Sequence, residues 1–275
     1  AGVRRALINL HHLPDRVRAA AESYGGALEF HFSHELEILG TAGLFGPLAE
    51  HIRGDRFLVT NGDVVSGLPT GPLFEDLEAH PEALAVLALR EGRPAYTSVE
   101  LSPDGRIGAF RNGAHMYAGL YAARRGLLQH LPPPGPAELV PDLLAPLLAS
   151  GAVRGVCLTG AWWDLGDART YLEATQEALR LLAEGGIIAP EGSRLEFRDG
   201  FPVLVHRRSQ VASGAAFTGF SVVGDGATVA GGAVLGDAVL LPGATLDSGQ
   251  RLVRAVLSPS GTARPRSLDP HPPPA

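Results

Sequence analysis

Two aspartates follow apolar segments of this chain in positions from which a carboxylate could meet a ligand. The first is Asp63, at the end of the run FLVTNGD over residues 57–63. The run predicts a buried strand over 56–60, and open α/β sheets bind ligands at the carboxyl ends of their strands. Taken alone, an aspartate after a glycine more often only caps a loop.

The second aspartate is Asp164, in the run WWDLGD over residues 162–167. Its tryptophans could wall a pocket, or they could be ordinary core residues. A long helix is predicted from Asp167 to Gly185-Gly186, and Asp167 suits its N-cap. Asp164 then has no structural role and becomes the second candidate.

Two carboxylates at neighbouring strand ends can hold Mg²⁺. This hard cation takes one or two carboxylates, adds phosphate oxygens of a substrate and keeps its remaining waters. We therefore expect Asp63 and Asp164 to converge, with Mg²⁺ as the cofactor.

A glycine turn precedes a predicted helix over 44–52. It consists of Gly40, Thr41, Ala42 and Gly43. Such a turn lets the backbone approach a ligand closely, and a helix start favours negative charge. By itself the turn is weak evidence for a site.

The elements that must position these residues alternate between strands and helices. This pattern predicts an α/β domain over 1–186 with a mostly parallel sheet and helices on both faces. The turn Pro103-Asp104-Gly105 predicts an antiparallel hairpin, so the sheet is expected to be mixed. The expected strands are 6–10, 28–32, 56–60, 83–89, 96–101, 106–110, 116–121 and 153–159, and further helices are expected from Pro14 and over 73–80, 124–131 and 140–149.

A different pattern begins after Ala189. Apolar residues recur at intervals of six, which is typical of a β-helix in which each hexad forms one face of a triangular coil. We expect a linker and a short left-handed β-helix over 187–258, with two coils, and a disordered Pro-rich tail over 259–275. The apolar positions are Val211, Phe217, Val223, Val229, Leu235 and Leu241, with small residues at Ala215, Ser221, Ala227 and Ala233.

Composition excludes several functional classes. The 275 residues are 45% hydrophobic, carry a formal charge of −6 and include no lysine, which argues against nucleic acid as a partner. Cys157 is the single cysteine, so no intrachain disulfide can form and we expect a buried, reduced thiol. No apolar run approaches the ~20 residues that span a bilayer. We therefore expect a cytoplasmic protein without a membrane partner.

Three motifs in this order resemble the sugar-1-phosphate nucleotidyltransferase family, whose members are also called NDP-sugar pyrophosphorylases. The motifs are EILGTAG over 37–43, NGD over 61–63 and WDLG over 163–166. The resemblance runs from residue 1 to about Leu182, and NLHH over 9–12 is similar to bacterial members. It implies a Rossmann-like domain, and many mannose-1-phosphate guanylyltransferase-like members also carry a β-helix.

The resemblance also implies roles for individual residues. The turn Gly40–Gly43, together with Asn61 and Gly62, would lie against the nucleotide, and Asp63 and Asp164 would bind catalytic Mg²⁺. Gly119 and Glu138 would contact the sugar. A sugar-1-phosphate oxygen would attack the α-phosphorus of a nucleoside triphosphate, releasing pyrophosphate and an NDP-sugar for polysaccharide synthesis.

One departure from the family leaves two interpretations open. The family's opening strand and its glycine-rich loop with arginine and lysine, which grip the triphosphate, have no match here. We expect an N-terminally truncated copy of an active enzyme, itself inactive without that loop. The alternative is a non-catalytic subunit that binds sugar nucleotides. Under either interpretation, we expect the β-helix to offer a contact surface for a homo-oligomer.

Two further signals are discounted. His31 and His34 would point to opposite faces of a strand, so they are a poor metal pair. A hexad array can belong to an acyltransferase, but residues 211–257 contain no histidine to serve as its base.

Overall fold

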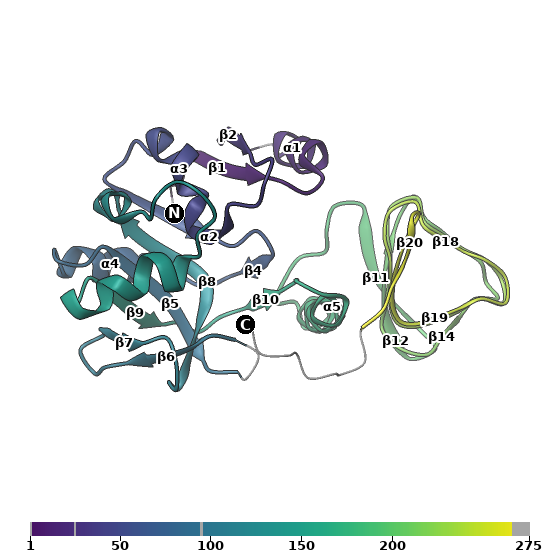
Figure 1. Cartoon of the computed structure of the whole chain (residues 1–275). Helices are drawn as coiled ribbons and strands as arrows, with labels where there is room; N and C mark the ends of the chain where they lie inside the picture. Colours follow the sequence, from purple (N-terminus) through teal and green to yellow (C-terminus); the bar gives the residue numbers. More distant parts are fainter. Residues whose placement is uncertain (1, 25, 94–95, 266–275) are drawn as a thin grey trace. The chain divides into compact units, whose positions relative to one another are not determined.

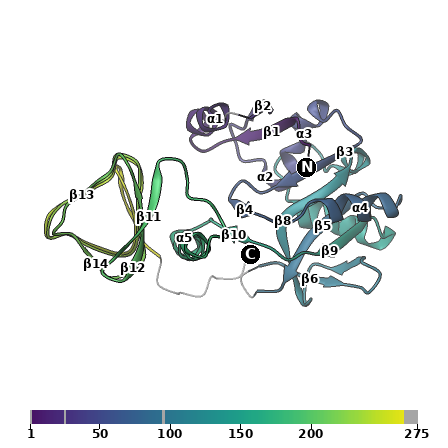
Figure 2. The same ribbon diagram turned by 180° about the vertical axis from the view of Figure 1, so that it is seen from behind.

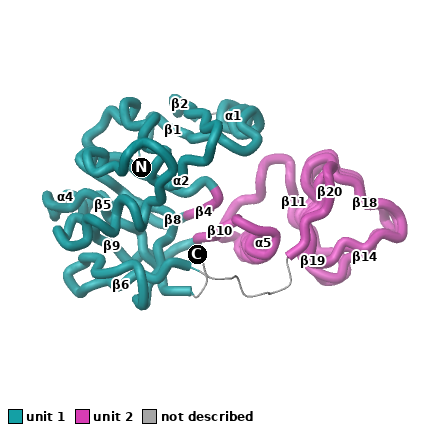
Figure 3. Tube along the Cα trace, in the orientation of Figure 1, with its two compact units in different colours: residues 1–62, 67–161 teal, residues 63–66, 162–275 magenta. Residues whose placement is uncertain are grey.

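The chain forms two compact units. The computed structural model describes residues 2–24, 26–93 and 96–265. One unit comprises residues 1–62 and 67–161, and the other comprises 63–66 and 162–275 (Figure 3). Each unit is described by itself below.

The first unit is built on a mixed six-stranded sheet (Figure 1). Its central strand β8 runs antiparallel to β3, β5 and β6, whereas β9 runs parallel to β5. Four strands therefore share one direction, and β7 and β8 run the opposite way, as expected of a sheet that contains a hairpin. The strands are β3 (Arg56–Thr60), β5 (Ala85–Glu91), β6 (Ser98–Leu101), β7 (Ile107–Ala109), β8 (His115–Arg124) and β9 (Val153–Cys157).

Successive side chains of β5 point to opposite faces of this sheet, and both faces are covered. Leu87 and Leu89 join a core with Phe45 and Leu143, while the intervening Ala88 is also fully buried and faces the other way. Helix α4 (Gly71–Ala79) packs near β5, β8 and β9. The core on the first face is lined by the short helical segments α2 (Gly40–Gly43), α3 (Phe45–Leu48), η2 (Arg125–His130), η3 (Leu139–Leu144) and η4 (Ala145–Ser150), while η1 (Ala49–His51) follows α3 without a buried residue.

These short segments differ from the regular helices expected over 44–52, 124–131 and 140–149. The first is divided into α3 and η1, and the last into a π-helical and a 3₁₀ segment. Pro47 lies inside the first segment and Pro141 and Pro146 inside the last, and proline lacks the N–H that continues an α-helical ladder. The spacing of apolar residues, from which the helices were predicted, does not reveal that these N–H groups are missing.

A buried ion pair joins α4 to β9. The Arg154 side chain is 4% exposed and donates from Nε to Asp76 Oδ2 at 2.7 Å, and from Nη2 to Asp76 Oδ1 at 3.0 Å. It also donates to the main-chain oxygen of Asp104 in the hairpin turn at 2.8 Å. The hydrogen bonds that Arg154 donates to Asp76 raise the pKa of Arg154, so the guanidinium stays charged.

Two parallel strands lie at the start of the described chain. β1 (Arg5–Leu10) pairs with β2 (Glu29–His34) in a separate two-stranded sheet, and α1 (Pro14–Glu22) connects them. The predicted strand–helix–strand order is confirmed here. Cys157 at the end of β9 is exposed, so the expectation of a buried thiol is wrong.

The second unit contains a small antiparallel pair and a long helix. β4 (Val64–Ser66) pairs with β10 (Trp162–Asp164), and α5 (Ala168–Ala183) follows. Asp167 caps α5 as predicted, because its carboxylate accepts the Thr170 N–H at 2.8 Å. No helix in the described ranges is both long and apolar enough to cross a membrane.

The rest of the unit winds into coils with three faces, seen nearly end-on in Figures 1 and 2. One face is formed by parallel β12 (Phe201–His206), β15 (Ser221–Val223), β17 (Val234–Leu240) and β19 (Arg251–Ser258), with antiparallel β11 (Ser193–Arg198) and β20 (Gly261–Ala263) at its edges. The other faces use β13 (Gln210–Val211), β16 (Thr228–Val229), β18 (Thr245–Leu246) and β14 (Ala216–Phe217). This winding has the geometry that the hexads predict, and its left-handed sense stays a prediction.

The hexad register holds for most of the array and then slips by one residue. Phe217, Val223, Val229 and Leu235 are buried inside the coils. Val205 pairs with Val223, 18 positions on, but Val223 pairs with Leu240, 17 positions on. Leu240 therefore points inward, and Leu241, which was predicted to do so, packs outside near α5.

The predicted domain bounds do not coincide with the compact units. Helix α5 belongs with the coils, because Leu172 and Leu179 pack against Phe220, Val239 and Val256. The boundary at residue 186 stays a prediction about domains. Of the tail predicted over 259–275, residues 261–263 form β20, and residues 266–275 lie outside the described residues.

Candidate functional site

The two candidate metal ligands lie together in the second unit. β4 and β10 pair so that Asp164 is opposite Val64, the residue after Asp63. The Leu165 N–H donates to the main-chain oxygen of Asp63 at 2.8 Å, which extends the pairing by one residue. The short strand pair therefore brings Asp63 and Asp164 to one place.

The carboxylates of this pair face a glycine. A Cβ placed on Gly166 would lie 3.1 Å from Asp164 Oδ1 and 3.8 Å from Asp63 Oδ2. The Gly166 N–H donates to Asp164 Oδ1 at 2.9 Å, and within the described residues no partner is recorded for the Asp63 carboxylate. Asp63 is exposed and Asp164 is half-buried, so both can be reached from solvent.

Asp167 does not share this position, because its carboxylate is used by the helix. It accepts the Thr170 N–H, and the Thr170 hydroxyl completes a capping box. The hydrogen bond from the Thr170 main chain lowers the pKa of Asp167 below its usual value. Asp164 is therefore the carboxylate of this segment that remains available.

The donor set of the pair fits a hard cation that shares its ligands with a substrate. Across residues 2–24, 26–93 and 96–265, no group of three or more His, Cys, Asp or Glu side chains is arranged to hold a metal. Mg²⁺ does not need such a group, since one or two carboxylates with phosphate oxygens and water suffice. Binding of Mg²⁺ by Asp63 and Asp164 stays a prediction.

The glycine turn lies in the first unit, against residues 135–139. The N–H groups of Ala42 and Gly43 donate to the main-chain oxygen of Ala137 at 2.9 and 3.1 Å, and the Ala137 N–H donates to Leu39 at 2.9 Å. Gly40 has a φ of 74°, and a Cβ on it would lie 2.5 Å from that Ala137 oxygen. The turn thus requires glycine at position 40 for both conformation and space.

Two residues predicted to serve different substrates are directly hydrogen-bonded. The hydroxyl of Thr41, predicted to face the nucleotide, donates to Oε2 of Glu138, predicted to contact the sugar, at 2.6 Å. The same hydroxyl accepts the Leu139 N–H at 2.8 Å. Both side chains are exposed.

Asn61 and Gly119 also meet within the first unit. The Asn61 N–H donates to the main-chain oxygen of Gly119 at 2.8 Å, just beyond the end of β3. Gly119 is buried, with a φ of 72°, at the irregular part of β8 where pairing with β5 shifts. Gly62 is exposed and has no neighbouring atom within 4 Å of a Cβ built on it.

Sequence reasoning did not identify Glu35 as part of this region. Its side chain is buried (5% exposed), and Oε2 accepts the Leu39 N–H at 3.1 Å, which holds the loop before Gly40. Its Oε1 is buried and has no hydrogen-bond partner in the described chain. A carboxylate one residue after a strand and five before the glycine turn was the signal that could have indicated it.

Two tyrosine hydroxyls near Gly119 are also unexplained. Tyr117 and Tyr121 on β8 have buried hydroxyls for which the described residues offer no hydrogen-bond partner. Burial raises the pKa of both side chains above the usual value. Tyr121 belongs to the same core cluster as Ala42 and Leu139, and Tyr117 packs against that cluster.

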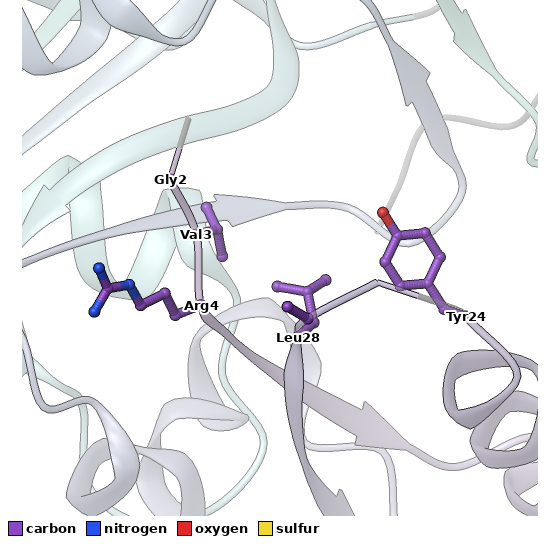
Figure 4. A pocket seen from close by; sticks show the side chains of 6 residues that line it. Gly2, Val3, Arg4, Tyr24 and Leu28 are labelled. Atoms are coloured by element: carbon purple, nitrogen blue, oxygen red, sulfur yellow. The ribbon is translucent and has the colours of Figure 1, made fainter.

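Other features do not contribute predicted site residues. A shallow hollow near the start of the chain is shown in Figure 4 and is lined by Gly2, Val3, Arg4, Tyr24, Ala27 and Leu28. The rings of His31 and His51 are tilted against each other, with centroids 3.6 Å apart. Neither feature contains a candidate named above.

Comparisons with known proteins agree with the geometry. The chain is 26% identical over 240 residues to mannose-1-phosphate guanylyltransferase of Mycobacterium tuberculosis, covering 83% of this chain and 64% of that protein. It is 27% identical over 198 residues to mannose-1-phosphate guanyltransferase of Aspergillus fumigatus, covering 67% of this chain and 54% of that protein. The chain thus spans less than two thirds of either relative, and no family model matches it.

The fold is shared with a solved structure. HddC from Yersinia pseudotuberculosis superposes with a TM-score of 0.56 at 19% identity, covering 64% of this chain and 80% of that chain, and it was also solved in complex with GMP-PN. These relatives agree with the resemblance that the order of the three motifs carries. The chain is similar in sequence to mannose-1-phosphate guanylyltransferases and shares its fold with HddC, which supports the sugar-1-phosphate nucleotidyltransferase family.

Proposed function

We propose that the protein transfers a nucleotidyl group from a nucleoside triphosphate to a sugar-1-phosphate, with Mg²⁺ held by Asp63 and Asp164. The observation that carries the proposal is the convergence of the two carboxylates at Gly166. The names of the relatives make GTP and mannose-1-phosphate the first pair to test.

In this proposal, each part of the chain has one task. A phosphate oxygen of the sugar-1-phosphate attacks the α-phosphorus of the triphosphate, the bond to the β-phosphate breaks, and pyrophosphate leaves. The metal, when bound, neutralises charge that develops on the phosphate oxygens. Asp63 and Asp164 fix the place where that charge is neutralised, and no covalent nucleophile from the chain is needed.

The remaining candidates would hold the substrates. The main chain of Gly40–Gly43, with Asn61 and Gly62, would lie against the nucleotide, and Gly119 and Glu138 would contact the sugar. Positioning of this kind can supply much of the rate enhancement in phosphoryl transfer. The predicted cytoplasmic location and assembly through the coils stay predictions.

The test is a pyrophosphate-release assay on the full protein with GTP, mannose-1-phosphate and Mg²⁺. We expect Asp63→Asn and Asp164→Asn to reduce kcat/KM by on the order of 100-fold or more, because each removes a charged ligand. Asp167→Asn is the matched control, since asparagine also caps helices well and activity should be kept.

Two outcomes would count against the proposal. Full activity of either Asp63→Asn or Asp164→Asn would contradict the metal assignment. Other triphosphates and sugar-1-phosphates are tested before the substrate pair is rejected. Binding of both substrates without any pyrophosphate release would favour the non-catalytic subunit instead.

A further inference from the structure

Thr41 occupies a junction between two segments nearly a hundred residues apart in sequence. Its hydroxyl donates to Glu138 Oε2 at 2.6 Å and accepts the Leu139 N–H at 2.8 Å. One small side chain therefore contacts both the carboxylate and the main chain of the second segment.

The two segments do not depend on that hydroxyl to stay together. Three main-chain hydrogen bonds already join them, from Ala42 and Gly43 to Ala137 and from Ala137 to Leu39. Ala42 and Ala137 also share the buried core. The Thr41 hydroxyl therefore acts mainly by restraining the position of the Glu138 side chain.

The other hydrogen bonds that Glu138 makes within the described residues involve its main chain. Its N–H donates to Asp142 Oδ2 at 2.6 Å, at the start of η3. Its carboxylate lies beside Gly40, where Oε1 would be 2.9 Å from an added Cβ. A glutamate has several rotatable bonds, and holding it in one rotamer costs entropy unless a partner restrains it.

The restrained carboxylate remains usable. Thr41 and Glu138 are both exposed, so solvent or a ligand can reach the oxygens. An ionised carboxylate can accept about four hydrogen bonds, and Thr41 takes one of these positions. The remaining acceptor positions of the carboxylate suit two hydrogen-bond donors side by side, such as two neighbouring hydroxyl groups of a sugar.

We propose that Thr41 is a positioning residue that presents Glu138 to the hydroxyl groups of the sugar-1-phosphate. The inference rests on the proposed function, which supplies the sugar as the ligand of Glu138. In this inference the side chain of Thr41 serves the binding of the sugar instead of the nucleotide. The main chain of the turn still lies against the nucleotide.

The variants separate the hydroxyl from the shape of the side chain. Thr41→Val keeps the β-branched shape and removes the hydroxyl, and Thr41→Ser keeps the hydroxyl. Thr175→Val is the matched control, because the Thr175 hydroxyl bonds only within α5, to the oxygen of Tyr171. Two quantities are measured on the full protein: KM for mannose-1-phosphate and GTP, and the calorimetric Kd of mannose-1-phosphate with GTP present and Mg²⁺ omitted.

We expect Thr41→Val to raise the sugar-phosphate KM and Kd about tenfold while KM for GTP and kcat change little, the pattern of lost ground-state binding. Thr41→Ser should restore most of the affinity. Glu138→Gln should weaken sugar-phosphate binding similarly, and adding Thr41→Val to it should cause little further loss, because residues that act as a unit are not additive.

Other outcomes overturn the inference. Equal sugar-phosphate affinity in Thr41→Val and wild type, or a rise in the KM for GTP alone, would assign the hydroxyl elsewhere. Fully additive losses in the double variant would show that Thr41 does not act through Glu138. If wild type binds mannose-1-phosphate but releases no pyrophosphate, the proposed function fails and the role of Thr41 can still be measured. If wild type does not bind mannose-1-phosphate, both the proposed function and the role of Thr41 are overturned.

Discussion

Replacing Gly40 by alanine should disrupt the glycine turn in two ways. The φ of 74° places an alanine in the left-handed region, which costs about 1–2 kcal/mol. The new Cβ would also lie 2.5 Å from the Ala137 oxygen, which accepts the N–H groups of Ala42 and Gly43. Weakening those two bonds adds up to about 1 kcal/mol each, so we expect a total loss of about 1–4 kcal/mol.

The matched control is Gly62→Ala, at a glycine of the neighbouring motif. Its position offers open space and no left-handed conformation, so the change should stay within about 0.5 kcal/mol. Urea unfolding gives the free energy of unfolding. Hydrogen exchange at the amides of Ala42 and Gly43 reports the turn directly, which matters because two compact units need not unfold together.

The reasoning is refuted if Gly40→Ala unfolds at the same urea concentration as wild type with unchanged exchange. It is equally refuted if Gly62→Ala loses as much stability, since the effect would then come from glycine content and not from this contact. In Gly40→Ala we also expect weaker binding of GTP, because the main-chain positions of the turn would shift.

Three further predictions concern the framework. Arg154→Met should lower the free energy of unfolding by about 3–5 kcal/mol, because it leaves the Asp76 carboxylate without its partner. Arg154→Met combined with Asp76→Leu should lower it less. Urea unfolding of both variants tests this, and an equal or larger loss in the double variant contradicts it. Leu240→Ala should cost about 2–5 kcal/mol and Leu241→Ala about 1 kcal/mol, and the reverse order would reject the register slip. Asp167→Ala should cost about 1 kcal/mol at pH 7. Because the pKa of Asp167 is lowered in the folded chain, its stabilisation is present above about pH 4 and disappears as the pH falls through the folded pKa, so the unfolding temperatures of wild type and variant should converge as the pH is lowered.

The sequence predicted the larger strands because their signals are local. An apolar run bounded by turn residues indicates β3 or β9 without knowledge of its partners. β4 and β10 were not predicted, because segments of three residues show no periodicity and are ordered only by pairing with each other. The pairing that assembles the candidate metal site therefore lay beyond the local pattern.

The slip of the hexad register has a similar cause. Residues 238–241 read AVLL, four apolar residues in succession, so a period of six cannot decide which of the two leucines points inward. Asp237 has a φ of 48°, and the coil that contains it is one residue shorter than the coil before. The pairing of Leu240 with Val223 decides that Leu240, and not Leu241, points inward.

The contact between Thr41 and Glu138 was also outside the reach of sequence patterns. Both were candidates, but for different substrates, and the resemblance supplied no reason to connect them. The connection arises because Gly40 permits a close approach of the turn to Ala137. The roles of both residues stay predictions, and only the fold shows that the two side chains are in contact.

The carboxylate pair leads to a last prediction that does not depend on turnover. Two ionised groups facing one point repel each other, and in the described residues no ion pair to Asp63 or Asp164 is recorded. A cation that relieves this repulsion binds the folded chain better than the unfolded chain, and stabilises it by about 2.7 kcal/mol at a concentration of 100 Kd. Mg²⁺ should therefore raise the unfolding temperature of wild type and of Asp167→Asn, but much less that of Asp63→Asn. An equal rise in all three would mean that Mg²⁺ binds elsewhere, whereas no rise in any would mean that the pair needs substrate phosphates to complete its coordination.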